Sequence, residues 1–388
     1  MKILIIEDDQ LVANVYRNKF ALEGFQAEIA LDGKVGLELV HSFRPDAILL
    51  DLVLPQVTGL ELMRRVRAEK DFEQVPIIVF SNTYVSKAVQ DAWKAGATKC
   101  LSKMSCTPRQ VIDAVRSTLK SNGAAETPKP AAAPVHVVSA EDDAEFQEQL
   151  RGDFFAELPA TLNSLRTLLQ GLVKADKEPA RLKALQDLFH RAHTLSGNAG
   201  IAGATQIALM ADALEALVKE LQEKPKNINV STLRTIASAI DFLAILFGNA
   251  ASPDDESIPA AEVLVVDDDA ISRRAIVFAL EKAKMKSLSA DDPIKALEVL
   301  LQKKFDLIFL DVDMPNMNGF ELCSKIRTLP QYSKTPVVFV TGLDDLESRA
   351  NSTMSGGNDF IAKPFLFIEL TVKALVHVLR SRLALAKK

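Results

Sequence analysis

The sequence has few cysteines, no basic excess and no long apolar run, and each absence excludes a class of protein. Among its 388 residues the three cysteines are Cys100, Cys106 and Cys323. They have neither the paired spacing of a metal site nor the even number of a disulfide framework, so we expect reduced thiols in a reducing compartment. The net charge of −5 argues against a generic surface for nucleic acids or anionic membranes.

Targeting and membrane signals are also missing. No apolar stretch approaches the roughly 20 residues that cross a membrane. The first residues, MKILIIEDD, form only a short apolar run before the acids begin, which excludes a signal peptide. We therefore expect a cytoplasmic protein that binds neither nucleic acid nor membranes.

The most informative feature that is present is an internal repeat. The segment 2–9, KILIIEDD, corresponds to 262–269, EVLVVDDD, and DAILLDLVLPQVTGLEL corresponds without a gap to DLIFLDVDMPNMNGFEL. The alignment places Asp51 on Asp311 and Lys103 on Lys363. Two copies of one domain therefore lie on either side of a different central segment.

Each copy alternates short runs of Ile, Val and Leu with longer segments of helical period. Continuously apolar strands between helices indicate a parallel sheet covered on both faces. In the first copy we predict strands near residues 3–7, 26–30, 46–50, 76–80 and 98–102, and a last helix at about 107–121. This pattern predicts an α/β doubly wound, flavodoxin-like sheet of five parallel strands, whose functional residues gather at the carboxyl ends of the strands.

The central segment differs, because four stretches between about Ala144 and Phe247 carry apolar residues at three- and four-residue spacing. They predict an all-α four-helix bundle. A Pro/Ala-rich linker precedes the bundle and a shorter acidic linker follows it. The predicted order is a domain at 1–121, a linker at 122–140, the bundle at 141–249, a linker at 250–261 and a second α/β domain at 262–388.

Acidic residues end the first and third strands of both copies. They are Glu7, Asp8 and Asp51 in the first copy, and Asp267, Asp268 and Asp311 in the second. Three converging carboxylates repel one another unless a cation joins them, and hard oxygen ligands suit Mg²⁺. We therefore expect a Mg²⁺ site in each copy.

A hydroxyl and a lysine complete each predicted site. The fourth strand ends at Ser81 or Thr341, and the fifth at Lys103 or Lys363. A hydroxyl and an ammonium group can each hold one oxygen of a phosphoryl group. The combination predicts transfer of a phosphoryl group to the central aspartate, with mainly electrostatic stabilisation.

Both copies closely resemble the receiver domain of two-component response regulators. The resemblance rests on LLDLVLPQVTGLEL and FLDVDMPNMNGFEL, and it implies Asp51 and Asp311 as phosphoacceptors. It also implies that Ser81, Thr341, Lys103 and Lys363 are switch residues that stabilise the phosphoryl group, and that the metal ligands are Glu7, Asp8, Asp51, Val53, Asp267, Asp268, Asp311 and Asp313. Val53 and Asp313 would contribute backbone carbonyls.

The two copies differ beside the lysine. The second copy has Lys363-Pro364 and Phe360, an aromatic at the family's switch position, whereas the first has Met104 and Cys100 there. An X-Pro bond adopts the cis form at little cost, but a non-proline cis bond costs about 2.5–4 kcal/mol. We therefore expect the Lys103 loop to take a different path and the first copy to switch differently.

The helical segment FHRAHTLSGNAG contains two histidines. On a helix His190, His193 and Gly197 share a face, so that His193 projects outward and Gly197 leaves space for a partner. Neutral imidazole is a competent nucleophile near physiological pH. A metal pair of His190 and His193 is an alternative, although no third ligand is evident.

The same segment resembles the histidine-phosphotransfer domain, whose signature is close to AHTLKGSAGNLGA and reads AHTLSGNAGIAGA here. The resemblance implies His193 as the phosphorylated residue and Gly197 as the position that gives access to it. Ser196 replaces the family's usual lysine, which removes a positive charge near the phosphoryl group.

The sequence thus predicts a two-component phosphorelay protein in which phosphoryl groups pass between Asp51, His193 and Asp311. No nucleotide-binding motif is visible, so we expect no kinase activity and a separate sensor histidine kinase as the donor. We also expect other receiver or phosphotransfer proteins as partners, and a second copy of this chain that forms a homodimer through a receiver domain. The alternatives are a phosphorylation-controlled scaffold, or the regulatory part of a longer protein with an output domain such as a cyclic-dinucleotide synthase.

Overall fold

The protein is described by a computed structural model that covers residues 1–81, 86–103, 106–122, 140–249, 261–342 and 355–386. Nearly all of the two linkers predicted at 122–140 and 250–261 lies outside these residues. The chain divides into two compact units, one formed by Met1–Thr161 with His190–Asp212 and the other by Leu162–Phe189 with Ala213–Lys388. Each unit contains one α/β domain and part of the central helical segment.

The α/β domain of the first unit contains five parallel strands, as predicted. They are β1 (Lys2–Ile6), β2 (Gln26–Ala30), β3 (Ala47–Leu50), β4 (Ile77–Ser81) and β5 (Lys99–Ser102), in the spatial order β2-β1-β3-β4-β5. The chain changes its direction of winding between β1 and β3. The carboxyl ends of these two neighbouring strands form the crevice in which doubly wound sheets place their functional groups.

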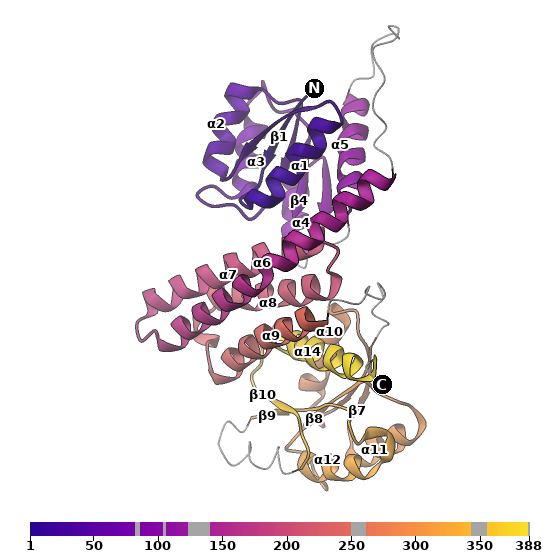
Figure 1. Cartoon of the computed structure of the whole chain (residues 1–388). Coiled ribbons are helices and arrows are strands. Elements are labelled where there is room, and N and C mark those ends of the chain that lie inside the picture. Colours follow the sequence, from indigo (N-terminus) through magenta and orange to yellow (C-terminus); the bar gives the residue numbers. More distant parts are fainter. Residues whose placement is uncertain (82–85, 104–105, 123–139, 250–260, 343–354, 387–388) are drawn as a thin grey trace. The chain divides into compact units, whose positions relative to one another are not determined.

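Helices cover both faces of this sheet (Figure 1). They are α1 (Gln10–Leu22), α2 (Gly33–Phe43), α3 (Gly59–Ala68), α4 (Ser86–Lys94) and α5 (Pro108–Asn122). Because successive strand residues point to opposite faces, Ile3 and Ile5 pack in one apolar cluster with α1 and α5, and Leu4 and Ile6 in another with α2 and α3. The strand ends between these two layers are thereby held in fixed positions.

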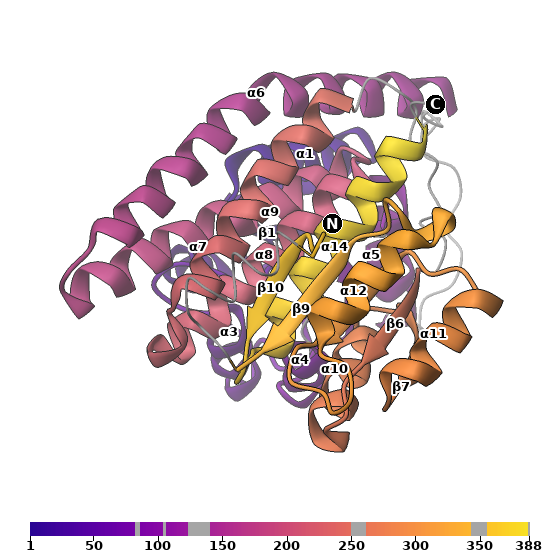
Figure 2. The ribbon, with the colours of Figure 1, turned by 90° about the horizontal axis from the view of Figure 1, so that it is seen from below.

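The second unit repeats this topology. Its strands are β6 (Glu262–Val266), β7 (Lys286–Ala290), β8 (Leu307–Asp311), β9 (Val337–Thr341) and β10 (Asp359–Ala362), in the order β10-β9-β8-β6-β7 (Figure 2). Its described helices are α10 (Ala270–Lys282), α11 (Pro293–Gln302), α12 (Gly319–Thr328) and α14 (Phe367–Ala386), with a 3₁₀ turn η2 (Pro330–Tyr332). The repeat in sequence is therefore a repeat of structure.

The central segment is helical, as its periodicity predicts. It consists of α6 (Ala140–Lys174), α7 (Glu178–Ile201), α8 (Thr205–Glu223) and α9 (Val230–Asn249), with a 3₁₀ turn η1 (Pro225–Asn227). The helix α7 continues through Gly197 and Gly200 and ends before Gly203, which has a φ of +70°. Glycine adopts this left-handed conformation without the steric cost that a Cβ imposes, so Gly203 terminates the helix.

Helix α9 differs from the expectation that no stretch approaches the length of a membrane span. By length and composition Val230–Asn249 is apolar enough to cross a membrane, and 50% of its apolar window is buried. Within the second unit its Ser231 and Thr235 hydroxyls donate hydrogen bonds of 2.5 and 3.1 Å to Glu369 Oε1 of α14. A half-buried helix with such bonds is typical of a helix packed in a protein core.

Candidate functional site

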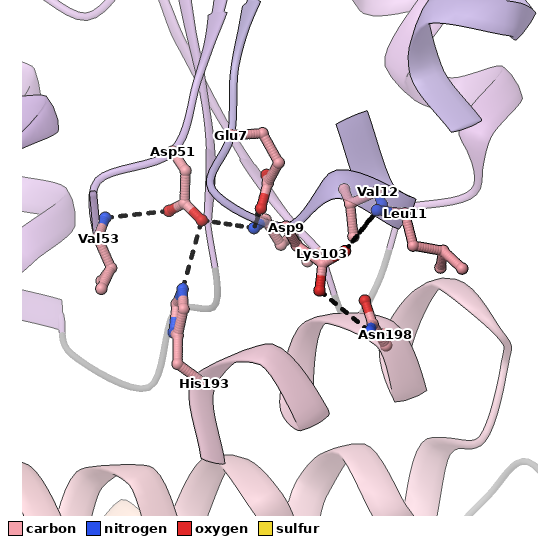
Figure 3. A network of polar contacts seen from close by, with 9 residues as sticks. All are labelled: Glu7, Asp9, Leu11, Val12, Asp51, Val53, Lys103, His193 and Asn198. Carbon is pink, nitrogen blue, oxygen red and sulfur yellow. Dashed lines mark hydrogen bonds and ion pairs between the residues drawn. The ribbon is translucent and has the colours of Figure 1, made fainter. Parts of the chain in front are cut away.

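Three charged side chains meet at the strand ends of the first α/β domain. Glu7 follows β1, Asp51 follows β3 and Lys103 follows β5, and none of them is more than 3% exposed. Lys103 Nζ lies 2.5 Å from Asp51 Oδ2 and 2.7 Å from Glu7 Oε2 (Figure 3). The ammonium group therefore contacts both buried acidic side chains at once.

This arrangement sets the protonation states. Burial raises the pKa of Glu7 to about 8, although Lys103 opposes the shift. Burial also acts to raise the pKa of Asp51, but Lys103 and the hydrogen bond with His193 outweigh it and lower the pKa below its usual range. Asp51 is therefore ionised at neutral pH, while Asp51 and Glu7 hold the pKa of Lys103 above its usual value against the effect of burial.

A second group at this edge has the character of a cation site. Ligand atoms of Asp8, Asp51 and His193 all lie within 4.8 Å of one another. Burial first, and then the charge of Asp51, raise the pKa of Asp8. The two carboxylates fit the preference of Mg²⁺ for hard oxygen ligands. The carboxylate of Glu7, which the sequence predicts as a further ligand, is paired with Lys103.

The remaining predicted residues of the first domain lie at the same edge of the sheet. The Val53 backbone N–H donates a 3.2 Å hydrogen bond to Asp51 Oδ1. Ser81 ends β4 and is 1% exposed, and the Lys103 backbone N–H donates to the Ser81 carbonyl at 3.3 Å. Cys100 is half-buried in the apolar cluster beside α4, whereas Met104 lies outside the described residues.

The second α/β domain brings together the corresponding set. Lys363 Nζ lies 3.0 Å from Asp267 Oδ2 and 3.1 Å from Asp311 Oδ2. The carboxylates of Asp267, Asp268 and Asp311 have oxygens within 4.8 Å of one another, and such hard oxygen donors are of the kind that Mg²⁺ prefers. Burial and the charge of Asp267 raise the pKa of Asp311. The Lys363 side chain is 25% exposed against 2% for Lys103, so the second site is the more open one.

Other predicted residues of the second domain occupy corresponding positions. Thr341 ends β9, is 2% exposed, and its carbonyl accepts a 2.7 Å hydrogen bond from the Lys363 backbone N–H. Asp313 is exposed, and the Lys363-Pro364 bond is cis. Phe360 is 8% exposed, with the Arg234 guanidinium carbon of α9 5.1 Å from its ring centroid.

His193 lies against the first of these sites, within the same compact unit. Its Nε2 atom is 3.3 Å from Asp51 Oδ2, and the histidine is 3% exposed (Figure 3). The side chain projects from α7 toward the Asp51 carboxylate, and the first α/β domain buries it. Gly197, one turn further along α7, is also buried. His190 belongs to no metal-binding group among the residues that the structure describes.

The structure adds two residues that our sequence analysis missed. Asp9 accepts hydrogen bonds from the backbone N–H groups of Leu11 and Val12 and so caps α1, and its other carboxylate oxygen accepts one from the Asn198 amide at 3.1 Å (Figure 3). Asp9 recurs as Asp269 in the second copy, and an aspartate at the same position before both helices predicts a helix cap. No local pattern identifies Asn198, because its partner is 189 residues away.

The protein has two doubly wound domains, each with acids, a hydroxyl and a lysine at its strand ends, and a helix that presents a histidine. This combination defines a two-component phosphorelay signalling protein. The family model described as "Response regulator receiver domain" matches residues 3–116 and 263–375, which together make up more than half of the chain. The chain belongs to the response regulator receiver family. Between the two receivers, residues 149–243 match the Hpt domain.

Several known proteins are similar to parts of this chain. Protein RcaC of Microchaete diplosiphon is 34% identical over 128 residues, which is 33% of this chain and 20% of that protein. Response regulator MprA of Mycolicibacterium vanbaalenii is 30% identical over 203 residues, 51% of this chain and 84% of that protein. The structure of chemotaxis response regulator CheY4 of Vibrio cholerae has 32% identity and a TM-score of 0.30, covering 31% of this chain and 99% of CheY4. The chain thus spans a fifth of the length of RcaC but most of that of MprA.

Proposed function

We propose that phosphoryl groups pass between Asp51, His193 and Asp311 in this protein. The observation that carries the proposal is the 3.3 Å separation of His193 Nε2 and Asp51 Oδ2, both of which are buried. A nucleophilic nitrogen and a carboxylate oxygen that face each other in this way can hold a phosphorus atom in line between them once the separation widens.

The transfer step is a substitution at phosphorus. The lone pair of neutral His193 Nε2 attacks the phosphorus of the Asp51 acyl phosphate, an N–P bond forms, the O–P bond breaks, and Asp51 leaves as a carboxylate. The low pKa of Asp51 suits a leaving group, and it is maintained by the Lys103 ammonium group. The reverse step returns the phosphoryl group to Asp51, so the same geometry serves both directions.

The other site residues stabilise charge. Lys103 and Lys363 would each bind one phosphoryl oxygen, and the hydroxyls of Ser81 and Thr341 another. Gly197 gives access to His193. The chemistry that Mg²⁺ supplies when bound is neutralisation of the phosphoryl oxygens. Its proposed ligands are Glu7, Asp8, Asp51 and the Val53 carbonyl in the first receiver, and Asp267, Asp268, Asp311 and the Asp313 carbonyl in the second.

A complete relay requires partners. We infer that a separate sensor histidine kinase supplies the phosphoryl group, that the order is Asp51 to His193 to Asp311 within or between chains, and that the protein is cytoplasmic. Other receiver or phosphotransfer proteins would exchange phosphoryl groups with it, and a receiver domain would form a homodimer. The domain boundaries that we propose are 1–121, 141–249 and 262–388.

Site-specific labelling tests the relay. The protein and its Asp51→Ala, His193→Ala and Asp311→Ala variants are incubated with Mg²⁺ and a phosphorylated donor kinase. Acid-labile, base-stable label identifies phosphohistidine, and base-labile label identifies phosphoaspartate. We expect phosphohistidine in the parent protein and none in His193→Ala, while His190→Ala, a change three residues away on the same helix, retains it.

The same experiment separates the relay from its alternatives. Label that never reaches position 193 with several competent donors contradicts the relay. Label confined to the aspartates would instead favour a phosphorylation-controlled scaffold, or the regulatory part of a longer protein with an output domain.

A further inference from the structure

We propose that the hydrogen bond between Asn198 and Asp9 docks the phosphotransfer helix on the first receiver and selects that receiver over the second as the partner of His193. The proposal deepens the function proposed above and rests on it. It assigns a positioning role to two residues that touch neither the phosphoryl group nor its acceptors.

The two oxygens of Asp9 have separate tasks. Oδ1 accepts both capping hydrogen bonds at the start of α1, from the Leu11 N–H at 2.8 Å and the Val12 N–H at 3.1 Å. Oδ2 is therefore available to accept the 3.1 Å bond from Asn198 Nδ2 (Figure 3). The Asn198 carbonyl oxygen is buried and has no hydrogen-bond partner among the described residues, so the contribution of this side chain lies in its amide donor.

An apolar contact accompanies the polar one. Ile201 of α7 is 4% exposed and belongs to the same apolar cluster as Val12 and Ala13 of α1. Along α7, His193 contacts Asp51, Asn198 makes the polar contact with Asp9, and Ile201 makes the apolar contact with α1. At 1.5 Å per residue these three contacts extend over about 12 Å of the helix. Together they fix both the position and the rotation of the helix relative to Asp51.

The corresponding surface of the second receiver has different chemistry. Asp269 uses both oxygens for its own helix, since Oδ1 accepts from the Ile271 N–H and Oδ2 from the Ser272 N–H. Ser272 and Arg273 occupy the places of Val12 and Ala13. Ser272 Oγ donates to Asp267 Oδ2 at 2.6 Å, and the Arg273 guanidinium donates to the Asp267 carbonyl at 2.7 Å. Docked there, Asn198 would meet a carboxylate whose two oxygens each already accept a hydrogen bond from a helix N–H, and Ile201 would meet a polar, charged surface.

This difference makes the contact a specificity determinant. The surface of α7 from His193 to Ile201 fits a receiver whose first helix begins Asp-x-Leu-Val-Ala, in which one cap oxygen remains available and small apolar side chains follow. It fits a receiver with Ser-Arg at those places less well, because buried polar groups would lose their partners.

Reversal of the hydrogen bond is the sharpest test. Asn198→Asp places a second carboxylate against that of Asp9. The two carboxylates repel each other, and the amide donor of the hydrogen bond is lost. Asp9→Asn in the same chain restores an amide–carboxylate pair with the roles exchanged, and asparagine caps a helix as well as aspartate does. The Asp9→Asn single variant is the reference for the double variant.

Two routes are measured in the full-length chain with labelled acetyl phosphate and Mg²⁺. The Asp311→Ala background isolates exchange between Asp51 and His193, and the Asp51→Ala background isolates exchange between Asp311 and His193. We expect Asn198→Asp to slow the Asp51 route about tenfold or more. The double variant should recover most of this loss, and the Asp311 route should change less than about twofold.

Hydrogen exchange gives a readout that does not depend on phosphoryl transfer. Amides at the start of α1 and in residues 193–201 should exchange faster in Asn198→Asp and return toward the parent rate in the double variant. If Asn198→Asp slows both routes equally, or if neither rate nor exchange changes, the proposal is wrong. Absence of label on His193 in every background would refute the proposed function but not the docking contact. The hydrogen-exchange measurements would then decide whether the Asn198–Asp9 contact docks α7.

Discussion

Lys103 Nζ lies 2.5 Å from Asp51 Oδ2, and Lys363 Nζ lies 3.1 Å from Asp311 Oδ2. The first pair is almost completely buried, whereas the Lys363 side chain is 25% exposed. The two receivers therefore depend on their lysines to different degrees.

Replacement of each lysine by methionine tests this difference. Lys103→Met leaves Glu7 and Asp51 buried without their cation, and removing one partner of a buried pair costs about 3–5 kcal/mol of folding free energy. We expect the first receiver to unfold at a clearly lower temperature in calorimetry. Lys363→Met is the matched control and should affect the second receiver less, because water solvates its open site. Equal losses in the two receivers would contradict this account.

The acids of the second receiver predict a Mg²⁺ site that calorimetric titration can detect. Asp268→Asn removes one of three converging oxygen donors, and we expect Mg²⁺ to bind this receiver about tenfold more weakly, which is 1.4 kcal/mol. Asp291→Asn removes an exposed carboxylate that pairs with Lys295 and should leave Mg²⁺ binding unchanged. Unaltered affinity in Asp268→Asn would show that this carboxylate is not a ligand.

Two glycines predict opposite outcomes of one substitution. A Cβ on Gly59, at the start of α3, would overlap the Asp51 carbonyl oxygen, so Gly59→Ala must displace the Asp51 backbone. We expect about 1–3 kcal/mol of destabilisation and slower labelling of Asp51. Gly152 is exposed in α6 with no atom within 4 Å of such a Cβ, so Gly152→Ala should stabilise its helix by about 1 kcal/mol. Denaturant unfolding measures both, and a stabilising Gly59→Ala would refute the close approach.

A buried ion cluster in the second receiver predicts a dependence on pH. Lys373 Nζ and His377 Nε2 lie 2.7 and 3.4 Å from Asp359 Oδ2. Burial acts to raise the pKa of Asp359, but the hydrogen bond with His377 and the charge of Lys373 outweigh it and lower the pKa. The folded pKa therefore lies below the unfolded value of about 3.9. The stabilisation is present above the unfolded value and lost as the pH falls through the folded one.

Asp359→Asn isolates this contribution. We expect the variant to lose about 3 kcal/mol at pH 7, because Lys373 remains buried without a carboxylate. The difference in unfolding free energy between parent and variant should stay constant from pH 7 to about 5 and shrink below about pH 4. A difference that instead grows as the solution is acidified would show that the pKa is raised in the folded state.

The sequence by itself determined the architecture and the chemistry of each strand end. Alternation of apolar strands with amphipathic helices predicts a doubly wound sheet, because only that packing covers both faces of apolar strands. The internal repeat then identifies the pairs Asp51 and Asp311, and Lys103 and Lys363, since residues that follow parallel strands meet at one edge. These inferences need only local periodicity and order along the chain.

Tertiary structure decided what the local pattern does not contain. The bond from Asn198 to Asp9 and the burial of His193 against Asp51 join segments far apart in sequence, and such contacts depend on how complete surfaces fit. The ion pair between Lys103 and Glu7 illustrates the same point, because the two residues are 96 positions apart in the sequence.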